Sequence, residues 1–113
     1  MPVDELKRYK VLYTNTAEQD ILAKADYIET FYRDSRQAYT WYMRLRTQIE
    51  KDLSFFPYKY QAYSAGAWAE KGVRELILRN DIVLYSVDEP SRSVLIHAVF
   101  TRGKNIAEDS REE

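Results

Sequence analysis

The sequence predicts an α+β fold of order β-α-α-β-β-β, in which a helical hairpin packs on one face of an antiparallel sheet. Two long segments with the apolar periodicity of helices are separated only by Asp34-Ser35. Three runs rich in β-branched residues then follow one another with short turns between them. Short connections between strands indicate that neighbouring strands are antiparallel. A break of two residues between helices makes the helices fold back on each other as a hairpin.

The first strand and the first helix are predicted near the start of the chain. The β-rich run YKVLYT at residues 9–14 predicts a strand. Two overlapping capping motifs follow, Asn15 with Glu18 and Thr16 with Gln19, and either can begin a helix. Apolar residues then recur at the spacing of an amphipathic helix: Ile21, Leu22, Ala25, Ile28 and Tyr32.

A second helix is predicted after Asp34-Ser35, where Gln37 has the spacing of a capped start. Its apolar stripe contains Ala38, Trp41, Tyr42, Leu45, Ile49, Leu53 and Phe56. The stripe stops at Pro57, because proline cannot continue a helix and disfavours helical geometry in the residue before it.

Three strands are predicted at residues 73–78, 82–87 and 94–101, after a loop at 57–72 that is rich in aromatic and small residues. Asn80-Asp81 and residues 88–91 provide the turns between them. Residues 82–85 are apolar on both faces, which is typical of a central strand. We expect the helices to cover one side of this sheet and to leave the other side free for function.

Length and composition indicate one globular domain. The chain has 113 residues, of which 45% are hydrophobic and 31% charged, enough for a core without disulfides. We expect a single domain over residues 1–104 and an acidic, mobile tail over 105–113, since the last nine residues carry four acids and one Arg. The formal net charge of −1 argues against a general polycation.

Several classes of protein are excluded by what the sequence lacks. With no Cys and 1 His, the chain cannot form disulfides, an Fe–S cluster or a Cys- or His-rich metal site. Nucleotide-binding glycine loops and the HExxH, GxSxG and EF-hand motifs are also missing, so we expect no cofactor and no metal. There is no long apolar run and no secretory signal, which predicts a cytoplasmic protein that does not bind membranes.

His97 is the one side chain whose ordinary pKa lies near neutrality. In a regular strand His97 lies on the same face as Leu95, Val99 and Thr101. The opposite face carries Val94, Ile96, Ala98 and Phe100. If the larger apolar set faces the helices, His97 faces the open side of the sheet. It is there either a general acid or base, or a half-buried histidine hydrogen-bonded to a neighbour.

Three cations flank the predicted strands. Arg74 opens the second strand, while Arg102 and Lys104 follow the last. We expect these strand ends to approach each other, so that the three cations bind a phosphate or a carboxylate of a partner. The alternative is that the arginines are solvated or paired with Glu75 and Asp81.

The loop between the second helix and the second strand contains four aromatic residues, which are Tyr58, Tyr60, Tyr63 and Trp68. Three interpretations are open. The residues form a lid on the core, a surface on which bases stack, or a groove that binds a peptide of a partner protein.

Several local patterns resemble the RelE/ParE toxin superfamily of bacterial toxin–antitoxin systems, whose members are often labelled plasmid stabilisation proteins. They are Tyr27-Ile28 late in the first helix, Leu53 with Phe56-Pro57 at the end of the second, and the runs GVREL, IVLYSVDE and VLIHAVFTR. The resemblance covers residues 16–104. It implies a RelE/ParE-like fold and a small toxin that is neutralised by a cognate antitoxin wrapped on its surface.

The two branches of this superfamily have different targets. RelE-like members are metal-independent endoribonucleases that cut mRNA on the ribosome, whereas ParE-like members poison DNA gyrase. Arg102 matches a phosphate-binding arginine of the RelE type, but Glu75, Ile77 and Ile82 stand where that type has cations, and residues 105–108 lack its tyrosine. Arg74 matches an arginine that recurs in the ParE type.

The resemblance therefore implies a ParE-like toxin that inhibits growth by binding gyrase through Arg74, Arg102 and Lys104. The alternative is a ribonuclease in which Arg74 and Arg102 hold the phosphate and His97 moves protons. A further alternative is a non-toxic relative that keeps the scaffold as an interaction module. A homodimer and a toxin–antitoxin hetero-oligomer are both open.

Overall fold

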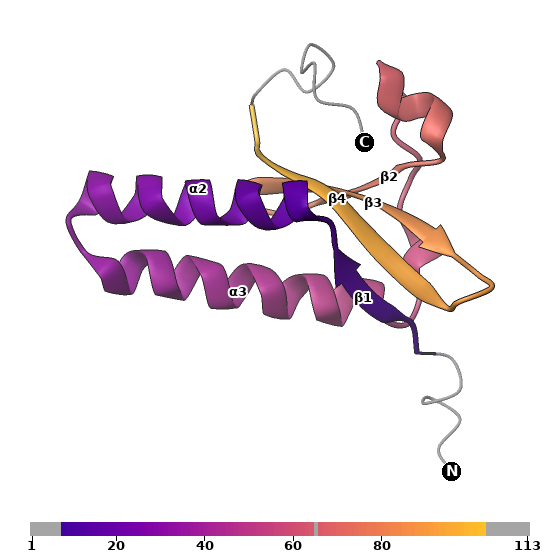
Figure 1. Cartoon of the computed structure of the whole chain (residues 1–113), viewed down its shortest axis with the longest axis horizontal. Coiled ribbons are helices and arrows are strands. Elements are labelled where there is room, and N and C mark those ends of the chain that lie inside the picture. Colours follow the sequence, from indigo (N-terminus) through magenta and orange to yellow (C-terminus); the bar gives the residue numbers. More distant parts are fainter. Residues whose placement is uncertain (1–7, 65, 104–113) are drawn as a thin grey trace.

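The computed structural model describes residues 8–64 and 66–103, and its elements follow the predicted order (Figure 1). Lys104 and the predicted tail at 105–113 lie outside the described residues. The elements are β1 (Lys10–Tyr13), α2 (Asn15–Tyr32), α3 (Ser35–Leu53), the 3-10 turns η1 (Pro57–Lys59) and η2 (Ala67–Lys71), β2 (Arg74–Ile77), β3 (Asp81–Asp88) and β4 (Ser93–Thr101).

The four strands form one sheet in the order β1-β4-β3-β2. The pairs β2–β3 and β3–β4 are antiparallel, as predicted for strands joined by tight turns. The pair β1–β4 is parallel, which differs from the antiparallel sheet that we expected throughout. The two strands are far apart in sequence, with both helices between them, so no tight turn imposes an antiparallel pairing.

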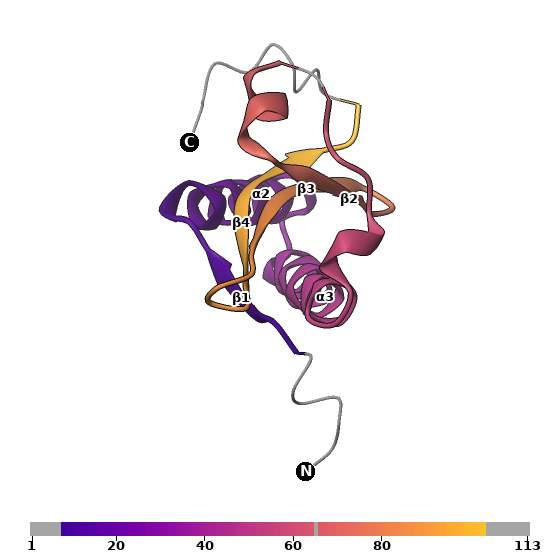
Figure 2. The ribbon, with the colours of Figure 1, turned by 90° about the vertical axis from the view of Figure 1, so that its right-hand side faces the viewer.

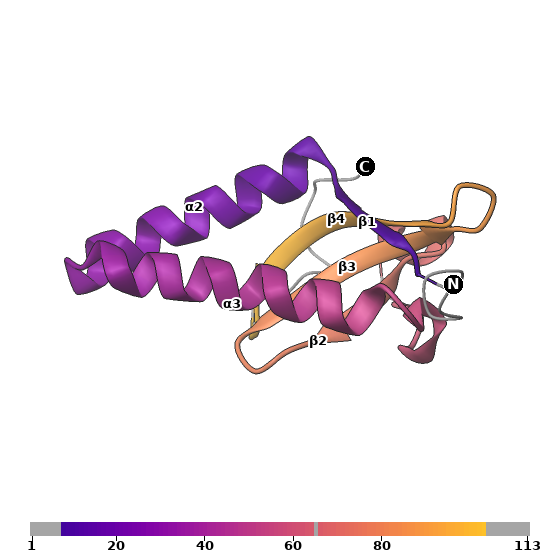
Figure 3. The same cartoon turned by 90° about the horizontal axis from the view of Figure 1, so that it is seen from below.

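The helical hairpin packs on one side of the sheet, as predicted (Figure 2). The main core lies between them and includes Ile21 of α2 and Leu45, Ile49 and Leu53 of α3 against Tyr85 and Ile96. The far end of the hairpin extends beyond the strands (Figure 3). The predicted stripe residues Leu22 and Tyr32 of α2 are 59% and 56% exposed, and of these two Tyr32 lies at that far end. None of the helices in the described part of the chain is long and apolar enough to cross a membrane.

The helix ends follow capping rules, with one shift from the prediction. Thr14 caps α2 by accepting a hydrogen bond from the backbone N–H of Ala17 at 3.0 Å, one residue before the predicted caps. Asp34 caps α3 as predicted, with 2.9 Å from its Oδ1 to the Arg36 amide. The second helix ends at Leu53 and does not include Phe56, because the chain turns into η1 at the proline.

The other side of the sheet is partly covered, so the prediction of a fully open face is wrong. A second core lies there, built from Trp68, Val73, Leu84, Ala98 and Phe100. Its lid is η2, on the side of the sheet opposite the helices (Figure 1). The part that carries Ser86, Leu95 and His97 remains partly exposed. At the two edges of the sheet, Leu12 of β1 and Ile77 of β2 are 43% and 47% exposed.

A β-bulge at His97 changes which side chains face the helices. Leu84 pairs with Ala98 and Tyr85 with Ile96, so His97 is an extra residue with no partner in the ladder. Beyond the bulge, Val99 packs in the helix-side core while Ala98 and Phe100 pack in the second core. The alternation predicted for this strand is therefore correct before His97 and wrong after it.

Candidate functional site

The exposed part of the sheet face is centred on a serine–histidine pair. Ser86 Oγ lies 2.7 Å from His97 Nε2, across the β3–β4 ladder at the bulge. The imidazole also lies beside the Trp68 indole, with 6.1 Å between ring centroids. His97 thus has the geometry of a half-buried histidine held by a neighbour. A hydroxyl bonded to an imidazole is also the arrangement that activates a serine or moves a proton.

Arg74 supports the loop before its own strand. Its Nη1 donates to the carbonyl oxygens of Tyr60 at 2.6 Å and Tyr58 at 3.3 Å. The guanidinium carbon lies 5.0 Å from the centroid of the Tyr58 ring. Arg74 therefore fixes the loop backbone around η1 and stacks on an aromatic side chain.

Arg102 has a similar role at the other end of the sheet. Its Nη1 donates to the carbonyl oxygens of Leu78 at 3.3 Å and Arg79 at 3.4 Å, and its backbone N–H donates to Asn80 O at 3.0 Å. Arg102 therefore stabilises the β2–β3 turn while it remains exposed to solvent.

The prediction that the strand-end arginines converge is wrong. Arg74 pairs with Tyr85 near the middle of β3, whereas Thr101 at the end of β4 pairs with Asp81, the first residue of β3. Strands β2 and β4 run in the same direction because each is antiparallel to β3, so the start of one lies far from the end of the other. Glu75 and Asp81, the alternative partners, bind Gln61 and Lys24 instead. Lys104 lies outside the described residues.

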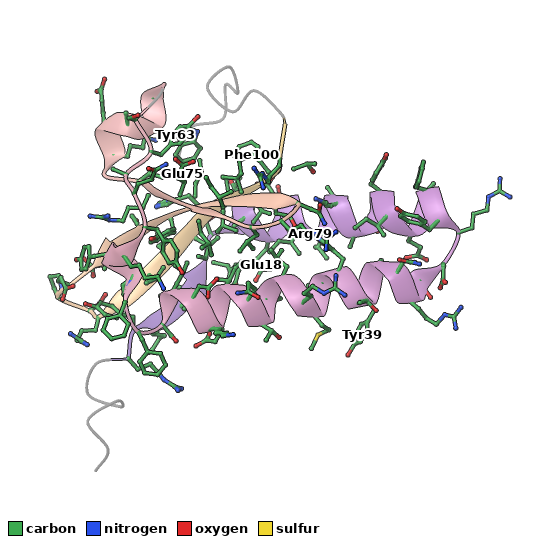
Figure 4. All side chains as sticks on the ribbon, turned by 180° about the vertical axis from the view of Figure 1, so that it is seen from behind. Glu18, Tyr39, Tyr63, Glu75, Arg79 and Phe100 are labelled. Carbon is green, nitrogen blue, oxygen red and sulfur yellow. The ribbon has the colours of Figure 1, made fainter. Side chains whose placement is uncertain are left out.

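The four aromatic residues of the loop divide between core and surface. Trp68 is 2% exposed in the second core, with Tyr63 packed against it, so these two form the predicted lid. Figure 4 shows Tyr63 and Phe100 on the side of the sheet away from α3. Tyr60 is partly buried against the main core, while Tyr58 is 48% exposed. The prediction that Trp68 contacts a partner is wrong, because its ring is buried.

A tyrosine–carboxylate cluster at the β3–β4 turn was missed by the sequence analysis. Tyr9 Oη donates to Glu89 Oε2 at 2.6 Å, and Tyr58 also hydrogen-bonds to this carboxylate. The hydrogen bonds from Tyr9 and Tyr58 lower the pKa of Glu89, while the bond to Glu89 raises the pKa of Tyr9. Tyr9 and Glu89 are 80 residues apart, and no local pattern connects them.

A buried polar network joins both helices to the sheet and was also missed. The Asp81 carboxylate accepts from Lys24 Nζ of α2 and from Trp41 Nε1 of α3, the latter at 3.1 Å. The side chains of Lys24 and Asp81 are 18% and 7% exposed. Asp81 reads as a turn residue in the sequence, and only the packing of the hairpin brings Lys24 and Trp41 to it.

Comparison with known proteins supports the fold. No family model and no curated protein matches the sequence. Among solved structures, the toxin–antitoxin complex RelBE2 from Mycobacterium tuberculosis matches with a TM-score of 0.64 and 20% identity, over 89% of this chain and 99% of that chain. The chromosomal ParDE TA system from P. aeruginosa matches with a TM-score of 0.68 and 16% identity, over 84% and 97%. The chain therefore has the RelE/ParE fold that its sequence motifs indicate.

Proposed function

We propose that this chain is the toxin of a type II toxin–antitoxin system, and that a cognate antitoxin neutralises it. The observation that carries the proposal is the fold, which is shared along almost the whole length of chains from a RelBE2 and a ParDE system. The motifs from Tyr27-Ile28 to Arg102 support the same assignment independently, because they rest on the sequence and not on the likeness of fold. Both proposed targets lie in the cytoplasm, which is the compartment that we propose.

For the mode of action we propose a ParE-like inhibitor that binds DNA gyrase without cleaving a substrate. Cleavage of RNA requires cations that converge on one phosphate. Arg74 and Arg102 lie at opposite ends of β2 and each donates to backbone carbonyls. Their separation favours two distinct contacts on a protein target over one phosphate clamp. Arg102 is the exposed anchor in this proposal, and Arg74 presents Tyr58.

One observation favours a second candidate, a RelE-like ribonuclease. The Ser86–His97 hydrogen bond of 2.7 Å places a group able to move protons on the partly exposed sheet face. In this candidate His97 transfers the proton of the attacking 2′-hydroxyl, and mRNA on the ribosome is the substrate.

Induced expression in a bacterial host, with and without the partner gene from the adjacent reading frame, tests these proposals. We expect growth arrest that the partner relieves, together with an SOS response and gyrase-linked DNA breaks. Translation-dependent mRNA cuts that disappear in His97→Ala would select the ribonuclease instead. Undiminished growth with soluble, folded protein would contradict both and leave a non-toxic interaction module.

The role of Arg102 is tested in the same assay. We expect Arg102→Ala to relieve growth arrest while the circular dichroism spectrum stays unchanged. Arg36→Ala is the matched control, because the Arg36 side chain is 89% exposed on α3 and pairs with Asp34, two residues away, at 3.1 Å. Equal toxicity of the two variants would remove Arg102 from the site.

A further inference from the structure

An aromatic pocket is lined by residues from the end of α3, from η1 and from the segment just before β1. Figure 3 shows these elements at the end of the molecule away from the α2–α3 loop. Its volume is about 440 Å³, within the range of ligand pockets. Four of its six lining residues are aromatic, and the full lining is Tyr9, Phe55, Phe56, Pro57, Tyr58 and Lys59. Two of these rings are accessible, since Phe56 is 67% and Tyr58 48% exposed.

The walls of this aromatic pocket are held by hydrogen bonds from the fold. The buried Tyr85 hydroxyl donates to the carbonyl oxygen of Pro57 at 2.5 Å. Arg74 donates to the carbonyl oxygen of Tyr60 at 2.6 Å, and the Tyr9 amide donates to Ser54 O at 2.6 Å. The pocket is therefore formed before any ligand binds, which lowers the entropic cost of binding.

Cations surround the aromatic pocket. The guanidinium carbon of Arg8 lies 5.1 Å from the Phe55 ring centroid, that of Arg92 4.4 Å from Tyr9, and that of Arg74 5.0 Å from Tyr58. Lys59 lines the pocket itself. Among the described residues, these four cations outnumber the carboxylate that contacts the rings, which is that of Glu89 and lies 3.9 Å from Arg92 Nη1. The rim thus carries a local positive charge although the whole chain has a formal net charge of −1.

We propose that the aromatic pocket binds single-stranded nucleic acid. A base stacks on the exposed rings, and the flanking phosphates contact Arg8, Lys59 and Arg92. Glu89 accepts a hydrogen bond from an exocyclic amino group of the base, as carboxylates do in base recognition. The tyrosine hydrogen bonds keep this group ionised, since they lower the pKa of Glu89.

The aromatic rings, the cations and Glu89 together favour single-stranded nucleic acid over an acidic peptide and over a nucleic-acid duplex. An acidic peptide would bring its carboxylates against Glu89, whereas a nucleotide can point its amino group there and keep its phosphate on the rim. A duplex offers the rim its phosphates but keeps its bases stacked inside, away from Phe56. The proposal is independent of the toxin assignment, because it concerns binding by the purified chain.

Fluorescence anisotropy with the purified full chain tests this site. The probes are a labelled 12-nucleotide single-stranded RNA, the DNA of the same sequence, the matching DNA duplex and a poly-glutamate peptide of similar charge. We expect both single strands to bind more tightly than the duplex and the peptide. With three phosphates neutralised, the logarithm of the affinity should fall with the logarithm of salt concentration with a slope of about −2. Comparison of the RNA and DNA affinities shows which of the two nucleic acids the site prefers.

Two sets of variants locate the binding. Phe56→Ala should weaken binding by about 5-fold to 150-fold, the range for loss of one base–aromatic stack. Phe31→Ala is the matched control, because Phe31 is 65% exposed on α2, and it should leave the affinity unchanged. Arg8→Gln combined with Lys59→Gln should make the salt slope shallower by about 1.4.

Three outcomes would overturn the site. The first is that neither single strand binds at low salt. The second is that the Phe56→Ala and Phe31→Ala variants bind the single strands with equal affinity. The third is that the poly-glutamate peptide binds and the single strands do not. Circular dichroism confirms that each variant is folded, which is expected because Phe56 is exposed and replacing it opens no cavity.

Discussion

The Asp81 network provides the most direct test of how the helices are attached to the sheet. Asp81 is 5% exposed at the start of β3, where its carboxylate accepts from Lys24 of α2 and from Trp41 of α3. Asp81→Ala leaves a mostly buried ammonium without its counter-charge and an indole N–H without its acceptor. Removal of one partner of a buried ion pair costs about 3–5 kcal/mol, so we expect the free energy of unfolding to fall by that amount.

Urea unfolding, followed by tryptophan fluorescence and circular dichroism, measures this loss. The midpoint should fall while the m-value stays unchanged, since the surface exposed on unfolding is the same. The double variant Lys24→Met/Asp81→Ala should recover at least about 1 kcal/mol relative to the sum of the two single changes, because neither charge is then left unpaired.

The exposed pair Asp34–Arg36 gives the control for this test. The Arg36 side chain is 89% exposed, so Arg36→Met should change the free energy of unfolding by less than about 0.5 kcal/mol. A loss below about 1 kcal/mol for Asp81→Ala, or additive effects in the double variant, would refute the view that this network holds the hairpin on the sheet.

Three further changes have expected outcomes in the same unfolding assay. Burial raises the pKa of Tyr13 from 10.0 to about 12, so the unfolded chain loses this proton first and the free energy of unfolding should fall as pH rises from 10 towards 12. Tyr13→Phe should reduce that fall, which unfolding curves between pH 9 and pH 11 will show. Arg33 ends α2 with φ 55°, a left-handed conformation that costs a side chain about 1–2 kcal/mol, so Arg33→Gly should raise the thermal midpoint. Trp68→Ala should cost about 3–5 kcal/mol because it empties the second core, whereas Phe31→Ala should cost less than about 0.5 kcal/mol.

The elements and their order could be predicted because they depend on local chemistry. The Asp34 cap lies at the predicted break between the helices, and Pro57 lies beyond the end of α3 as its geometry requires. The strands lie within two residues of their predicted bounds. The family motifs, read in order, indicate the fold that the two toxin–antitoxin structures share with this chain.

The candidate site was predicted less well, because its geometry depends on contacts between distant segments. The bulge at His97 shifts the alternation of β4 by one residue, and no local pattern distinguishes it from a regular strand. The predicted meeting of Arg74 and Arg102 failed because strand direction, and not closeness in sequence, decides which ends of a sheet are neighbours.

The sequence by itself therefore determined which segments are helix and strand, where they begin and end to within a few residues, and the family that they resemble. These properties follow from side-chain periodicity, capping and proline, each of which acts over a few residues. Only the tertiary structure decided that η2 covers part of the second sheet face, that Asp81 binds Lys24 and Trp41, and that Tyr9 meets Glu89. Those contacts join residues that are distant along the chain, and they exist only once the sheet and the hairpin have packed together.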